Sequence, residues 1–172
     1  MKRRFGLLVV AAAVLAAGPD LNACGDKSLS PGGIRMQRAL AARYPASVLA
    51  YVPSNSPAAA AARDLKLPDT LRFFGHRYHE VTTVAELRTS VETGQFNIVL
   101  ADLGVAADVE RDLGSSSNRV VLVPVAYKLT KSEARDAARQ RRFLIKAPGL
   151  AAQYLTTIAQ AVAFGSAGSR KG

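Results

Sequence analysis

Two residues that could do chemistry end apolar runs typical of strands. Asp102 is the one carboxylate in Phe96–Gly104 (FNIVLADLG), and Lys146 lies near the end of Arg142–Pro148 (RFLIKAP). Open α/β sheets carry their working groups just beyond the carboxyl ends of the strands. We therefore expect Asp102 and Lys146 to meet across one crevice. There they either bind an anion or another ligand or form a structural ion pair; alternatively, Asp102 caps the helix that follows it. We favour a structural role, because a lone carboxylate-lysine pair is common.

The elements that must position these residues alternate regularly along the chain. Apolar runs predict five strands, at residues 47–52, 78–82, 97–103, 119–126 and 143–146. Helical patterns occur at residues 58–67, 69–74, 83–93, 105–113, 132–141 and 150–164. Thr83 and Ser132 are expected to cap two of these helices. Continuous apolar strands are typical of a parallel sheet with helices on both faces, so we predict a single doubly wound α/β domain over residues 47–164.

The first 23 residues are typical of a signal peptide. Lys2, Arg3 and Arg4 form a basic start, and Phe5–Ala17 is an apolar segment of the usual length. This segment is shorter than the roughly 20 residues that a membrane-spanning helix needs. We expect export to the periplasm or cell envelope and no transmembrane span in the mature form; an uncleaved anchor is the alternative.

Cys24 is the only cysteine, so no intramolecular disulfide can form. The sequence Leu-Asn-Ala-Cys that ends at Cys24 resembles the lipobox of bacterial lipoproteins, although Asn22 stands where a small or aliphatic residue is usual. Cys24 is therefore a candidate for lipidation, which would tether the protein to a membrane. Ordinary cleavage after one of the nearby alanines is the alternative.

The regions that flank the predicted domain are poor in apolar periodicity. Residues 24–46 are expected to be a linker or arm. Gly25–Gly33 is rich in glycine, serine and proline, and Ile34–Tyr44, which mixes apolar with basic positions, is expected to form either a helical turn or an arm over the domain. Residues 165–172 (GSAGSRKG) are expected to be a flexible tail.

The chain has a large excess of positive charge. It contains 23 basic and 13 acidic residues, a formal net charge of +10 at pH 7. A surface of this kind attracts polyanions such as lipid headgroups or acidic envelope polymers, but we favour the alternative that the charge reflects a basic composition and serves solubility. No compact basic run with interleaved aromatic residues is present, so a nucleic-acid partner is not expected.

The order of the predicted elements and two motifs resemble the receiver domain of bacterial response regulators. The first motif runs from Gly75 to Leu103, with Gly-x-x-Tyr-x-x-Val-Thr-Thr, a helix and then GQFNIVLADL. The second is FLIKAP, which resembles the fifth strand of receivers. The resemblance covers residues 47–164 and implies a flavodoxin-like fold with five parallel strands. It also implies that Asp102 occupies the phospho-acceptor position and Lys146 an anion-contact position.

Two features that receivers use for phosphoryl transfer are missing. The first predicted strand ends in Ala50–Asn55 (AYVPSN), without the acidic pair that holds Mg²⁺, and the fourth ends in Val123–Ala126 (VPVA), without a hydroxyl. Phosphoryl transfer depends on positioning and charge neutralisation. We therefore expect Asp102 to be inactive as a phospho-acceptor.

No other catalytic pattern stands out in the sequence. His76 and His79 are three residues apart, but they lie where a turn enters a strand, so we predict no metal site. The chain has no Ser-His-Asp order, Gly-rich phosphate loop or paired carboxylates, so we predict no cofactor and no enzymatic activity.

We therefore expect a non-catalytic, exported, receiver-like module (a pseudo-receiver) that acts through contact with a protein partner. In receivers, the fourth strand, its helix and the fifth strand often carry partner contacts, and here that face is Lys128–Arg142, with Tyr127 beside it. One alternative is a phosphorylatable response-regulator receiver in two-component signalling. The other is a basic module that binds an anionic envelope polymer or lipid.

Overall fold

A computed structural model describes residues 31–114 and 120–168 of the chain. The predicted signal peptide (residues 1–23) and Cys24 lie outside these residues, as do residues 169–172.

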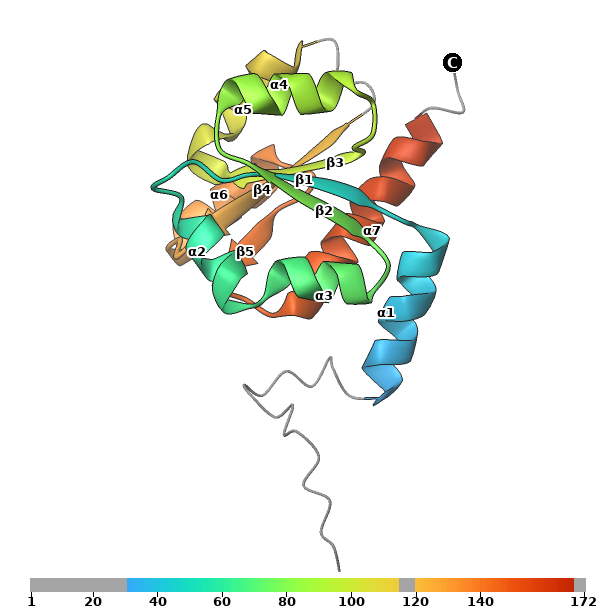
Figure 1. The fold of residues 1–172 in the computed structure, drawn as a ribbon. Coiled ribbons are helices and arrows are strands. Elements are labelled where there is room, and N and C mark those ends of the chain that lie inside the picture. The colour runs from blue at the N-terminus through green and yellow to red at the C-terminus, as the bar shows by residue number, and fades with distance from the viewer. Residues whose placement is uncertain (1–30, 115–119, 169–172) are drawn as a thin grey trace, which may run out of the picture.

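Five strands form one parallel sheet, in the order β2-β1-β3-β4-β5 (Figure 1). They are β1 (Ser47–Tyr51), β2 (Arg77–Val81), β3 (Ile98–Asp102), β4 (Val121–Tyr127) and β5 (Ile145–Ala147). Helices flank this sheet on both faces, and the strand order is that of flavodoxin-like folds. The predicted fold class is therefore confirmed.

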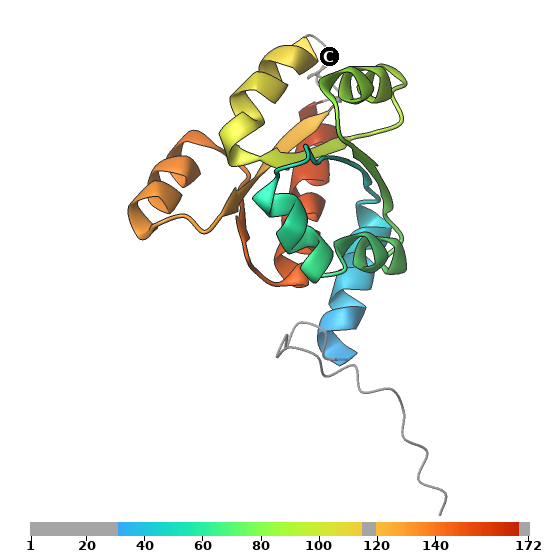
Figure 2. The same cartoon turned by 60° about the vertical axis from the view of Figure 1, so that its left-hand side comes forward.

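The helices divide between the two faces of the sheet (Figure 2). One face, which we call the α7 face, is covered by α1 (Pro31–Arg43), α2 (Pro57–Asp64), α3 (Leu67–Phe73) and α7 (Ala151–Gly168). The other, the α4 face, is covered by α4 (Val84–Glu92) and α5 (Ala106–Leu113), which follows the short 3₁₀ turn η2 (Leu103–Val105). The connection from β4 to β5 contains α6 (Lys131–Gln140).

Successive strand residues enter different cores, because side chains alternate across a sheet. Val48 and Ala50 of β1 belong to the core of the α7 face, whereas Leu49 between them belongs to the core of the α4 face. Both cores are buried, so each strand position that enters a core is committed to one face. This commitment fixes the direction of each residue at the strand tips.

Helix α6 stands apart from the other helices, as Figure 2 shows. Only Ala137 of this helix is buried, and most of its other side chains are exposed. Arg141, directly after the helix, forms an ion pair with Glu110 of α5. The helix therefore projects from the body of the domain but is held at its end.

The linker interpretation is wrong for Pro31–Gly33, and of the two possibilities for Ile34–Tyr44 the helical one is present, over more than a single turn. Residues Pro31–Arg43 form helix α1, which packs against α7. Gln37 is buried, and its Nε2 donates a hydrogen bond to Thr156 Oγ1 of α7 at 3.3 Å. Ile34, Gln37 and Ala41 face the domain, and because the middle residue of this stripe is polar, the stripe does not stand out by hydropathy.

The predicted flexible tail is wrong in its first half, because α7 continues to Gly168. Its glycine at position 165 lies close to β4: a Cβ atom added there would be 3.2 Å from Val121 Cγ2. Close packing of the helix backbone on β4 therefore explains a glycine inside the helix. Among the described residues, no helix is both long and apolar enough to cross a membrane.

Candidate functional site

Asp102 caps the N-terminus of α2, a helix that precedes it in the chain by more than 40 residues. Its Oδ1 accepts a hydrogen bond from the Ala58 backbone N–H at 3.2 Å. Beside it, Ser56 Oγ accepts from the Ala59 N–H at 2.9 Å, and Pro57 has no N–H to satisfy. The carboxylate therefore meets both the unpaired donors and the positive end of the helix dipole.

The expected cap on the following helix is not formed, because Asp102 makes no side-chain hydrogen bond to η2. Among the described residues, neither expected structural role, an ion pair or a cap on the following helix, is formed by Asp102, which caps α2 instead. The reason is the alternation of the strand: Asp102 follows Ile98 and Leu100 onto the α7 face, where α2 begins.

Lys146 points away from Asp102, so the expected meeting of the two groups is wrong. Asp102 pairs with Val125 of β4, and Lys146 pairs with Ala126. Because Val125 and Ala126 are neighbours on one strand, they project to opposite faces, and so do their partners. Lys146 is exposed, and within residues 31–114 and 120–168 no ion pair joins it to Asp102.

An open hollow of about 520 Å³ lies over the carboxyl ends of β1, β3 and β4. Its walls come from the loops after these strands: Pro53, Asn55, Ser56, Pro57, Leu103, Gly104, Val105, Tyr127 and Leu129, together with Asp102 and Val125 at its floor. Of the described residues that line it, Asp102 alone is acidic. The hollow is therefore mainly apolar, with one carboxylate.

A much smaller cavity, of about 20 Å³, adjoins this hollow and is lined mainly by residues of the α7 face. Tyr154 of α7 forms part of its wall and is 1% exposed. Its hydroxyl has no hydrogen-bond partner among the described residues. Burial and the charge of Asp102 raise the pKa of Tyr154 to about 12, so the group is a neutral O–H donor at pH 7.

Tyr154 was not singled out by the sequence analysis. It lies in a helix of apolar residues and follows the same spacing as Leu155 and Ile158, which are core residues. A tyrosine among core positions indicates only that its hydroxyl must either form a hydrogen bond or remain unpaired. Its position opposite Asp102 depends on the tertiary fold.

The two histidines have separate structural surroundings. His76 is buried, and its Nδ1 accepts a hydrogen bond from the Ala46 N–H at 3.1 Å. Burial lowers the pKa of His76. His79 is exposed on β2 and stacks on Phe96, with ring centroids 6.0 Å apart. No group of three or more potential metal ligands occurs in the part of the chain that the structure describes.

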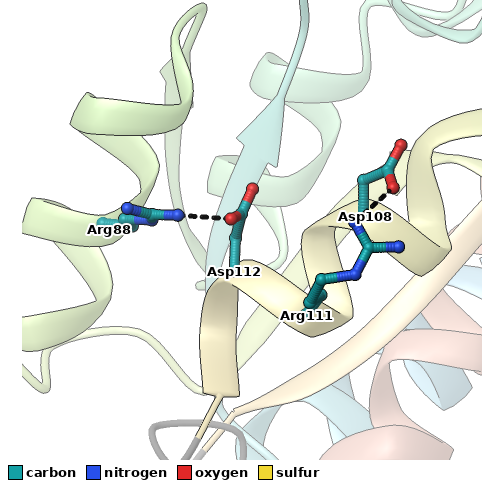
Figure 3. A network of polar contacts seen from close by, with 4 residues as sticks. All are labelled: Arg88, Asp108, Arg111 and Asp112. Atoms are coloured by element: carbon teal, nitrogen blue, oxygen red, sulfur yellow. Dashed lines mark hydrogen bonds and ion pairs between the residues drawn. The ribbon is translucent and has the colours of Figure 1, made fainter.

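The charged side chains of α4 and α5 are largely paired (Figure 3). Arg88 of α4 forms an ion pair with Asp112 of α5, and Asp108 and Arg111 are paired within α5 at 3.0 Å. These exposed pairs contribute little to stability. They do neutralise the surface of this part of the α4 face.

Helix α6 carries a different pattern of charge. Lys131, Arg135 and Arg139 are spaced by four residues, so they form one stripe along the helix. All three are exposed, and none forms an ion pair with another described residue. We call these residues the basic stripe. It faces away from Ala137, the buried residue of the helix.

The fold and the site define a class: a flavodoxin-like α/β domain whose strand tips carry one carboxylate, used as a helix cap. Comparison with protein-family models, with curated proteins and with solved structures finds no match to this chain.

Replacing Asp102 by alanine is expected to lower the free energy of unfolding by about 1 kcal/mol, because Ala58 loses its acceptor. Asp102→Asn keeps an acceptor oxygen and should lose less. Urea denaturation followed by circular dichroism measures both changes. Asp108→Ala, which removes an exposed carboxylate, is the control and should change the free energy by less than about 0.5 kcal/mol. An equal effect of Asp102→Ala and Asp108→Ala would contradict the cap.

The free energy of unfolding is expected to fall as the pH drops below about 6.5, the ordinary pKa of histidine. The folded-state pKa of His76 is lowered by burial, so below pH 6.5 the unfolded chain binds a proton that the folded chain does not. Stability is thus present above this pH and is lost as the pH falls through the folded-state pKa. His76→Asn should flatten this dependence in urea titrations between about pH 5 and pH 7. His79→Asn is the matched control, and the prediction fails if both variants keep the wild-type slope.

Proposed function

We propose that this chain is a non-catalytic, receiver-like module of the cell envelope that binds an acidic surface of a protein partner through helix α6. The basic stripe carries this proposal, because it is a row of exposed cations that form no ion pair with another described residue, although Glu133 and Asp136 lie on the same helix.

The arrangement at the strand tips supports a role without catalysis. One oxygen of Asp102 is already hydrogen-bonded to the N-terminus of α2. The lysine at the anion-contact position lies on the other face of the sheet. A phosphoryl group on Asp102 would therefore lack the lysine contact and would displace a helix cap.

Helix α6 is held in place at both ends, which favours recognition of a folded partner. At its start, Thr130 and Glu133 form a capping box, and the Lys128 N–H donates to the Ala147 carbonyl at 2.7 Å. At its end, Arg141 is paired with Glu110. A preorganised helix loses little conformational entropy on binding.

The spacing and surroundings of the basic stripe indicate the kind of partner. Its three cations extend over about 12 Å of helix, which matches an acidic patch or an acidic helix on another protein. At the base of α6, the Arg142 guanidinium lies 3.8 Å from the centroid of the Phe164 ring, which is 43% exposed. Arginine and aromatic residues are enriched in protein interfaces, so this neighbour favours a protein over a lipid or polymer.

The leader sequence supports the proposed compartment. Residues 1–23 have the pattern of a signal peptide, and six residues separate Cys24 from the start of α1 at Pro31. Lipidation of Cys24 would keep the domain, and with it α6, within a short distance of the membrane surface. A partner in the cell envelope is therefore proposed.

Incubation of the protein with acetyl phosphate and Mg²⁺ is expected to give no covalent adduct in intact-mass spectrometry. The reason is that Asp102 has neither a second carboxylate nor Lys146 beside it. A receiver of known activity, treated in parallel, controls for the phosphodonor. An adduct that forms on the wild type and is lost in Asp102→Ala would contradict the non-catalytic proposal.

A photo-crosslinking amino acid at position 135 is expected to capture one protein species in cells of the organism that produces this protein. Lys131→Glu combined with Arg139→Glu should reduce the yield at least tenfold, because like charges then face the acidic partner. Arg35→Glu combined with Arg63→Glu changes the net charge equally on exposed parts of α1 and α2 and should leave the yield unchanged.

The same amino acid at position 89 on α4, which is exposed, reports non-specific capture. Equal adducts from positions 89 and 135, or an adduct with lipid or polymer alone, would overturn the proposal of a protein partner at α6.

A further inference from the structure

The two hollows at the strand tips meet at Asp102. The outer hollow of about 520 Å³ and the inner cavity of about 20 Å³ share Ser56, Asp102 and Val125 in their walls. The outer hollow has the size of a small-molecule site, and the inner cavity has room for one water-sized group. The two hollows therefore adjoin at these three residues.

Two residues that line the smaller cavity, Tyr154 and Asp102, offer one hydrogen-bond donor and one acceptor without partners in the described part of the chain. The donor is the hydroxyl of Tyr154, which is 1% exposed and close enough to Asp102 to feel its charge. The acceptor is the second carboxylate oxygen of Asp102, since only Oδ1 is bonded to Ala58. The other tyrosine in the wall, Tyr78, already donates its hydroxyl to Glu80 at 2.8 Å.

This pair of groups selects one kind of head group. A group between them must accept a hydrogen bond from Tyr154 and donate one to Asp102. A hydroxyl does both. An ammonium cannot accept, and a carboxylate cannot donate and would meet the charge of Asp102. The charge of Asp102 is already stabilised by the N-terminus of α2, so a cation is not needed to balance it.

The outer hollow selects the body of the ligand. The outer hollow is lined with apolar and aromatic surface from Leu103, Val105, Tyr127 and Leu129. The nearest polar side chains in this wall, Asn55 and Ser56, belong to the loop before α2. An aliphatic or aromatic body would bury against this surface while the head reaches inward.

We propose that the strand tips form a binding site for a small apolar alcohol, whose hydroxyl lies between Tyr154 and Asp102. The site is separate from the basic stripe of α6 and does not depend on the function proposed for that helix.

The test is a titration of isotope-labelled protein, followed by amide chemical shifts, with three probes that share one body. They are 2-phenylethanol, 2-phenylethylammonium and phenylacetate. We expect 2-phenylethanol to shift the amide resonances of Ala58, Gly104 and Val105 in a saturable way. The ammonium and carboxylate probes should bind at least tenfold more weakly, because each leaves Tyr154 or Asp102 unpaired.

A pair of matched variants locates the head group. Tyr154→Phe removes the buried hydroxyl and should weaken binding of 2-phenylethanol about tenfold. It should still fold, because it removes an unpaired polar atom and keeps the ring. Tyr127→Phe removes a hydroxyl from the outer wall and should leave the affinity within about twofold. No saturable shifts with 2-phenylethanol, equal binding of all three probes, or unchanged binding by Tyr154→Phe would each overturn the proposal.

Discussion

The pairing register of the parallel strands decides which side chains of this domain can meet. Apolar cores cover both faces of the sheet, so a shift by one residue would move a whole strand's buried side chains to the wrong core. The register is therefore fixed by burial, and it also decides which residues lie side by side at the strand tips. Asp102, in line with Val125, bonds to α2 and lines the same cavity as Tyr154, while Lys146, in line with Ala126, does neither.

A single carboxylate at the strand tips behaves differently from a pair of carboxylates. Two acidic groups would repel each other and invite a cation, whereas Asp102 alone is satisfied by the N–H of Ala58 and the dipole of α2. That bond ties the end of β3 to the helix after β1. The hydroxyl of Tyr154 stays unpaired beside it, at a cost of about 1–3 kcal/mol for a buried donor. The unpaired Tyr154 hydroxyl therefore needs an explanation, and a ligand that bonds to it at the strand tips would supply one.

The sequence predicted what depends on short-range patterns. Four strands were predictable as apolar runs and β2 (RYHEV) by its alternation, and Thr83 was predictable as a cap because Glu86 completes a capping box. Ser132 was wrong as a cap: Thr130 takes this role, because Glu133 lies three residues after it. The direction of Lys146 could not be predicted, since it depends on register between strands. The unpaired hydroxyl of Tyr154 depends on contacts between β3 and α7, which no local pattern encodes.

The two charged regions of the domain differ in how their charge is balanced. The negative charge of Asp102 is stabilised within the fold by the N-terminus of α2, without a ligand. The basic stripe of α6 has no such compensation in the described residues, although the helix is fixed by its capping box and by the bond from Arg141 to Glu110. The cations of a fixed row repel one another, and binding of an external anion lowers this repulsion. The first region therefore suits a neutral ligand, and the second suits an acidic one.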